Sequence, residues 1–180
     1  EIIKFNRMKS TKIILAAFQG LILFVSSSLN TLVGIKGKNF VLLGGDSSFF
    51  RGLTVMGNEY KKVSKIDRNM AIAISGEQGD VEIFLEWLKS FLDLARISSR
   101  PISLKSTVYI ARRDIAQSLR KSPQDVNMMI GGWSAEDGPQ LFWLDSTGAM
   151  QELEFGAHGA ASTYILTILD RGHSSEICLD

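Results

Sequence analysis

Few side chains in this sequence have the type and spacing of a metal-binding or cofactor-binding motif. His158 and His173 each stand alone, and Cys178 is the only cysteine, so the sequence has no CxxC pair, HExxH motif or histidine cluster. The glycine pairs at 44–45 and 131–132 have neither a helix-opening GxGxxG pattern nor a P-loop lysine, which favours close packing over phosphate binding. We therefore expect no metal and no cofactor, and any chemistry would fall to hydroxyl, carboxylate and amine groups.

The overall composition is that of a globular protein with nearly balanced charge. Its 180 residues include 20 Lys and Arg against 19 Asp and Glu, a net charge of +1, and 45% of them are hydrophobic. This balance argues against nucleic acid as a partner, since a dedicated nucleic-acid-binding protein usually has a basic surplus. A chain of this length can form one domain with a sizeable core, and the absence of a disulfide framework fits a reducing compartment.

The N-terminal segment has a pattern of its own. Lys9 and Lys12 precede an apolar run at residues 13–25 and three serines at 26–28, the order found in a secretory signal. The run is shorter than the ~20 apolar residues of a membrane span. A leader or unrelated extension that never joins the folded domain is the alternative, and we favour it. We expect residues 1–28 to stay apart from a domain formed by residues 29–180, with no membrane contact for that domain.

Alternating helical and strand patterns begin at Thr31. Residues 31–36 and 39–45 are β-rich runs separated by Gly37 and Lys38, which predicts a hairpin. The second run is continuously apolar at residues 40–43, as expected for a strand buried on both faces. Further short strands are predicted at residues 53–56, 62–66, 70–75, 126–130, 141–145 and 150–155.

Three helices are predicted among these strands. Asp80 is a candidate N-cap for a helix with one apolar stripe of Ile83, Phe84, Trp87, Leu88, Phe91 and Leu94. A second helix should begin near Ser103 and pack through Leu104, Val108, Ala111, Ile115 and Leu119. A third should cover about residues 157–170. This order of elements predicts a layered α/β domain.

Six segments, taken in order, are similar to the proteasome β-subunit family. They are TLVGIKG at 31–37, FVLLGGD at 40–46, KVSKID at 62–67, AISGEQGD at 73–80, VNMMIGGW at 126–133 and FGAHG at 155–159. Each is weak alone, whereas their order and spacing are specific. The resemblance implies a four-layer αββα sandwich, the N-terminal nucleophile hydrolase fold, and it is strongest to the non-catalytic fourth position of the β ring.

The resemblance also assigns the site. Active members cut peptide bonds with an N-terminal threonine that a lysine and an aspartate support, and Lys62 and Asp46 match those two positions. The nucleophile position then falls on Asn30, whose amide cannot perform acyl transfer. The three residues are thus expected to be relict positions, with no catalytic residue. The serine that the family places after the glycine of the last turn is also missing, since Ala160 follows Gly159.

An active threonine endopeptidase with Thr31 as nucleophile is the alternative. It requires a one-residue shift relative to both Asp46 and Lys62, and such a shift in a strand turns a side chain to the opposite face. Thr31 would then point away from Lys62. We interpret His158 as a hydrogen-bonded turn residue and not as a base.

The resemblance implies partners and a location. The partners would be neighbouring β subunits and the α ring of the core particle, in the cytoplasm and nucleus. The family continues after the third helix with another helix and two strands, so the resemblance implies a domain truncated at its C-terminus. Tyr164, Ile165 and Ile168 should then be unusually exposed.

Overall fold

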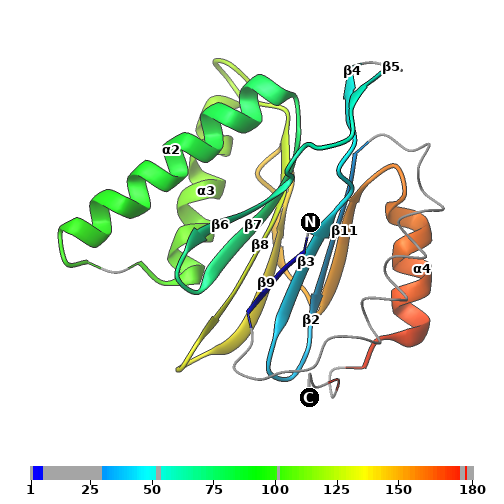
Figure 1. Ribbon diagram of the computed structural model, residues 1–180. Coiled ribbons are helices and arrows are strands. Elements are labelled where there is room, and N and C mark those ends of the chain that lie inside the picture. Colours follow the sequence, from blue (N-terminus) through cyan, green and yellow to red (C-terminus); the bar gives the residue numbers. More distant parts are fainter. Residues whose placement is uncertain (1, 6–29, 52–53, 101, 175–176, 178–180) are drawn as a thin grey trace.

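The computed structural model describes residues 2–5, 30–51, 54–100, 102–174 and 177. In this part of the chain, two sheets lie face to face, with helices on their outer sides (Figure 1). A small separate hairpin of β4 (Phe49–Arg51) and β5 (Thr54–Gly57) projects from one end. The prediction of a mixed α/β domain is confirmed.

The first sheet has the strand order β1-β3-β2-β11. Its centre is the predicted hairpin of β2 (Thr31–Lys36) and β3 (Val41–Gly45), and the turn is closed by a 2.9 Å hydrogen bond from Gly37 N to Phe40 O. Residues 40–43 are each at most 3% exposed. The second sheet covers one face of this strand and α4 covers the other, so the strand is buried on both faces, as the apolar run predicted.

The second sheet has the order β10-β9-β8-β7-β6, and every pairing in it is antiparallel. Short turns join consecutive strands except between β7 and β8, where two helices are inserted. Its strands are β6 (Val63–Asp67), β7 (Met70–Gly76), β8 (Val126–Ser134), β9 (Gly138–Leu144) and β10 (Met150–Glu152).

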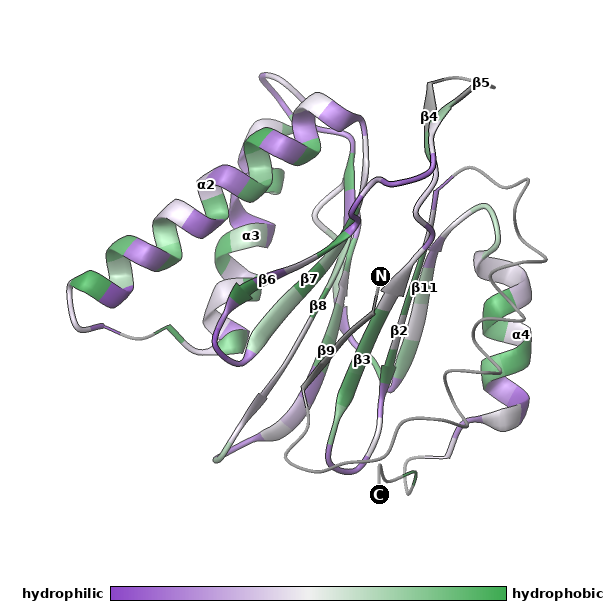
Figure 2. Ribbon diagram, viewed as in Figure 1, coloured by the Kyte–Doolittle hydropathy of each residue, from purple (hydrophilic) through white to green (hydrophobic). Residues whose placement is uncertain are grey.

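Helices α2 (Gln78–Ile97) and α3 (Leu104–Ser118) cover the outer face of the second sheet, and α4 (Ser162–Gly172) covers that of the first (Figure 1). Apolar side chains fill three spaces. Phe84 and Val108 pack with the second sheet, Leu32 and Met129 lie between the sheets, and Val33 packs with Ile165 of α4. In Figure 2, green, apolar colour is most evident on β2 and β3 of the first sheet. None of the helices in the described ranges is long and apolar enough to cross a membrane.

The start and the buried face of α2 differ from the prediction. Glu77 is the N-cap, accepting from the backbone nitrogens of Gly79 and Asp80, whereas Asp80 lies in the first turn and accepts from Asp125 N. The buried side chains are Val81, Phe84, Leu85, Leu88 and Leu92, and the predicted Ile83, Phe91 and Leu94 are exposed. Apolar residues cover more of the helix surface than the part that is buried. Periodicity alone therefore did not identify which of these residues face the sheet.

Helix α3 follows its prediction more closely. Ser103 is the N-cap, and Leu104, Val108, Ala111 and Ile115 are buried. Leu119 lies beyond the end of the helix and is 38% exposed.

The predicted third helix begins too early. Residues 157–159 belong to strand β11 (Phe155–Gly159), which pairs antiparallel with β2, and α4 begins only at Ser162. Pairing with the edge of β2 satisfies backbone groups that a helix there would leave unpaired. Within α4, Tyr164 and Ile168 are exposed, as expected, whereas Ile165 is only 4% exposed because it packs against the first sheet.

The expectation that residues 1–28 stay apart from the domain is wrong for part of that segment. Strand β1 (Ile2–Phe5) pairs antiparallel with β3, in the register Ile2 to Gly44 through Phe5 to Val41. The physical reason is that β3 otherwise has a free edge, whose unpaired backbone groups accept another strand. The apolar run at residues 13–25, and Cys178, lie outside the described residues.

Candidate functional site

The candidate site lies where three strand ends meet. Asn30 precedes β2, Asp46 follows β3, and Lys62 precedes β6, so both sheets contribute to it. Antiparallel pairing in the hairpin places the end of β3 beside the start of β2, since Leu32 pairs with Gly45. The facing of the two sheets then brings Lys62 to the same point. The structure therefore brings together all three residues that the sequence singled out.

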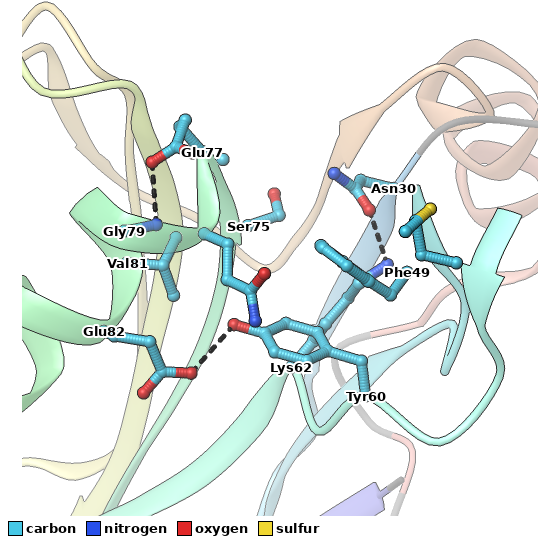
Figure 3. A pocket seen from close by; sticks show the side chains of 12 residues that line it. Asn30, Phe49, Tyr60, Lys62, Ser75, Glu77, Gly79, Val81 and Glu82 are labelled. Carbon is cyan, nitrogen blue, oxygen red and sulfur yellow. Dashed lines mark hydrogen bonds between the residues drawn. The ribbon is translucent and has the colours of Figure 1, made fainter. Parts of the chain in front are cut away.

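Lys62 is the centre of the site. Its side chain is 2% exposed, and its Nζ donates to both carboxylate oxygens of Asp46 at 2.8 Å. The same Nζ donates to Oδ1 of Asn30 at 2.7 Å (Figure 3). Three oxygen atoms thus surround a buried ammonium group, which matches its three donors.

Asp46 also accepts hydrogen bonds from two backbone N–H groups. Its Oδ1 accepts the backbone N–H of Thr31, and its Oδ2 accepts that of Ser48 at 3.3 Å. The hydroxyl of Thr31 is buried and has no hydrogen-bond partner among the described residues. Lys62 therefore contacts the side chain of Asn30, whereas Thr31 contacts this network through its backbone: its N–H donates to Asp46 Oδ1, and its carbonyl oxygen accepts from Asp46 N at 3.1 Å.

The backbone at Asn30 is unusual. Its φ of 40° lies in the left-handed region, which asparagine tolerates better than most residues. On the neighbouring strand, Gly159 has a φ of +92°, and a Cβ built there would lie 1.7 Å from the carbonyl oxygen of Asn30. The close approach of these two backbones requires glycine at 159.

A cavity of about 650 Å³ opens beside Asn30 and Lys62. Phe49, Met56 and Val81 contribute apolar surface, and Glu77 and Glu82 contribute carboxylates (Figure 3). Its volume is in the range of pockets that hold small ligands or side chains.

Tyr60 and Glu82 join the two sides of the cavity. The Tyr60 hydroxyl donates to Oε1 of Glu82 on α2 at 3.2 Å. Burial, together with the negative charge of Glu82, raises the pKa of Tyr60 to about 12. The phenol, which is protonated at neutral pH in any tyrosine, therefore remains a donor further into the alkaline range.

Burial also lowers the pKa of Lys62, although the hydrogen bonds and charge of Asp46 oppose that shift. The ammonium group thus gives up a proton more readily than an exposed lysine. The arrangement can polarise a carbonyl group and pass a proton, but the group held against Lys62 is an amide, which is a poor nucleophile. In the described ranges, no cluster of three or more His, Cys, Asp or Glu side chains could hold a metal ion.

No pattern in the sequence pointed to the cavity or to the Tyr60–Glu82 contact. Tyr60 is two residues from Lys62, but Glu82 lies on an insertion between strands, and no local spacing relates the two. Ser75, which is 7% exposed and lines the cavity, was predicted only as a strand residue. The signal in the sequence that could have identified Ser75 as a site residue was its position at the end of β7, directly before Gly76.

His158 lies between the sheets, away from the cavity. It is 7% exposed, its ring stacks on Trp143 with centroids 4.6 Å apart, and its Nε2 lies 3.2 Å from the carbonyl oxygen of Met128. Burial lowers the pKa of His158, although backbone hydrogen bonds to Met128 and Leu144 and the charge of Asp145 oppose that shift. The residue is a hydrogen-bonded link from β11 to the second sheet.

We expect the free energy of unfolding to fall as the pH decreases below about 6.5, the ordinary pKa of histidine. The unfolded chain takes up a proton at His158 before the folded chain does, which adds a slope of up to about 1.4 kcal/mol per pH unit. Urea unfolding at a series of pH values measures this slope. His158→Phe keeps a ring against Trp143 but cannot titrate, so its slope should be smaller, and an unchanged slope would contradict the assignment.

The fold and the site together define a mixed α/β protein with an aspartate–lysine pair beside the start of a buried strand. The proteasome subunit family matches residues 28–180. Proteasome subunit beta type-2 of Dictyostelium discoideum is 31% identical over 156 residues, which cover 84% of this chain and 79% of the relative. The chain therefore belongs to the proteasome subunit family, and within it to the β-type subunits.

Other relatives carry similar names. Probable proteasome subunit beta type-4 of Neurospora crassa is 30% identical, with 84% of this chain and 76% of the relative covered. Proteasome subunit beta type-4 of Saccharomyces cerevisiae is 26% identical, with 83% and 77% covered.

Proposed function

We propose that this chain is a non-catalytic structural subunit of the proteasome core particle, at the fourth position of the β ring. In this role it completes the chamber in which ubiquitin-dependent protein degradation takes place. The observation that carries the proposal is the 2.7 Å hydrogen bond from Lys62 Nζ to Asn30 Oδ1. An amide occupies the place beside the lysine where an active subunit needs a hydroxyl.

Three further observations support the absence of a nucleophile. The Thr31 hydroxyl is buried, and Lys62 does not contact it. Alternation along β2 puts the side chain of Thr31 on the same face as Val33, which packs toward α4. The residue after Gly159 is Ala160, where the family has a serine. On this reading, Asp46 and Lys62 form an ion pair that now stabilises the start of β2.

We also propose a fold family and domain limits for this chain. The facing sheets with helices on both outer sides support an αββα sandwich of the N-terminal nucleophile hydrolase type. Residues 29–180 would form the subunit domain, and 1–28 would be a leader or extension, apart from the strand formed by Ile2–Phe5.

Assembly with other subunits is the other half of the proposal. Closure of a ring requires different contact surfaces on the two sides of each member. Large apolar side chains are exposed along α2, and exposed apolar surface favours burial in an assembly; they are Ile83, Phe91, Leu94 and Ile97. The partners would be neighbouring β subunits and the α ring, in the cytoplasm and nucleus.

One experiment tests both halves. The chain is tagged and purified with whatever particle it forms, and the particle is treated with an electrophilic probe that modifies N-terminal threonines. We expect α and β subunits to be recovered with the chain, and the probe to modify other β subunits, which serve as an internal control, but not this one. An adduct on Thr31 would establish the active-peptidase alternative, and recovery of the chain alone would contradict a ring role.

A further inference from the structure

The side-chain amide of Asn30 accepts a hydrogen bond from a cation. Its Oδ1 accepts a hydrogen bond from the Lys62 ammonium group at 2.7 Å. A cationic donor on a carbonyl oxygen stabilises the negative charge that develops there when a nucleophile attacks the carbon. Here that carbon is Cγ of Asn30.

A nucleophile is available in the next residue. The backbone nitrogen of Thr31 is bonded through its hydrogen to Oδ1 of Asp46, so a carboxylate is in place to receive that proton. Asp46 in turn contacts Lys62 through both of its oxygens at 2.8 Å. The base, the electrophile and the oxyanion-stabilising cation are thus in one connected network.

We propose that Asn30 is a site of self-catalysed modification, in which the Thr31 backbone nitrogen attacks Asn30 Cγ and closes a succinimide that water opens to aspartate or isoaspartate. The N–Cγ bond forms, and the nitrogen's proton passes to Asp46. The bond from Cγ to Nδ2 then breaks, and Lys62 supplies a proton to the departing ammonia and regains one from Asp46. Water adds to the succinimide, so the net change is the replacement of the amide by a carboxylate.

The hydrogen bonds of Asp46 favour cyclisation over direct attack by water on the amide. Each carboxylate oxygen of Asp46 already accepts two hydrogen bonds. Oδ1 accepts from Lys62 Nζ and Thr31 N, and Oδ2 accepts from Lys62 Nζ and Ser48 N. The base is therefore directed at a backbone nitrogen. The lowered pKa of Lys62 helps the proton reach the ammonia. Asn30 is half-buried and lines the cavity, so water can reach the succinimide and ammonia can leave.

This inference does not depend on the proposed function, because the amide can react whether or not the chain is a ring subunit. Its product has a consequence for the site. Conversion to aspartate puts a second carboxylate beside Lys62, and conversion to isoaspartate adds a backbone atom at the start of β2. Either product would alter the network that holds this strand.

The test compares the folded chain with the same chain in urea. Purified protein is incubated at neutral pH in both states, and peptide mapping by mass spectrometry follows Asn30, with Asn69 and Asn127 as internal references. We expect Asn30 to convert at least about tenfold faster in the folded chain than in urea, with both aspartate and isoaspartate as products, while the references show no such acceleration. Equal or slower conversion in the folded chain would overturn the proposal.

Variants separate this reaction from its alternatives. Lys62→Arg keeps a cationic donor, whereas the double variant Asp46→Asn with Lys62→Met removes base and cation without leaving an unpaired charge. We expect the double variant to convert about tenfold to a hundredfold more slowly than Lys62→Arg. Equal rates would overturn the proposal, as would a product containing aspartate but no isoaspartate, or cleavage of the chain between Asn30 and Thr31 in place of deamidation.

Discussion

Replacing Lys62 by methionine is expected to lower the free energy of unfolding by about 3 kcal/mol, the low end of the range for breaking a buried ion pair. The Lys62 side chain is 2% exposed and that of Asp46 is 18% exposed. Without the ammonium group, the carboxylate keeps the two hydrogen bonds from backbone N–H groups that the described residues provide, and the Asn30 amide loses the Lys62 donor. Partial access of water to Asp46 limits the loss. Urea unfolding of the full chain, followed by tryptophan fluorescence, measures the change.

Two further variants show whether the effect comes from the unpaired charge. The double variant Asp46→Asn with Lys62→Met removes both charges and should recover most of the lost stability, since a buried pair contributes little net energy over neutral residues. Lys65→Met replaces an exposed lysine on β6, the strand that begins directly after Lys62, and should change stability by less than about 0.5 kcal/mol. If the double variant were as unstable as Lys62→Met, lost packing and not the charge would be the cause.

Replacing Gly159 by alanine is expected to be the most damaging single-methyl change near the site, at more than about 4 kcal/mol. The added Cβ would lie 1.7 Å from the Asn30 carbonyl oxygen and 3.2 Å from Thr31 Cα, and the φ of +92° is strained for any side chain. Relief requires β11 to separate from β2 where Gly159 pairs with Thr31. The Asn30 side chain would then move away from Lys62. The measurement is again the urea unfolding curve.

Gly138 provides the matched control for that variant. It has a φ of +72°, but a Cβ there would meet nothing within 4 Å. Gly138→Ala should therefore show the conformational cost alone, about 1–2 kcal/mol. The difference between the two variants isolates the close contact of the backbones, and equal losses would show that this contact is relieved without separating the strands.

The elements with a strong local signal were predictable from the sequence. The β2–β3 hairpin, the buried run at residues 40–43 and the start of α3 near Ser103 all follow from short-range chemistry: turn residues, continuous apolar character and the onset of a helical apolar period. The buried face of α2 and the strand conformation of residues 157–159 could not be predicted from the sequence. In α2, apolar residues cover more than the buried stripe, and β11 exists only because the edge of β2 is present to pair with it.

At the site, the sequence by itself determined which groups are present: an amide at 30, a carboxylate at 46, an amine at 62 and no serine at 160. Together with the spacing of the surrounding motifs, these residue types indicated the family and led to the prediction that the chain has no nucleophile. The tertiary structure decided which of the groups touch. It placed the Asn30 amide at Lys62, left the Thr31 hydroxyl buried with no hydrogen-bond partner in the described part of the chain, and joined Tyr60 to Glu82 across a cavity. Such contacts join residues that are far apart along the chain, so they depend on how the two sheets face each other, which no local pattern specifies.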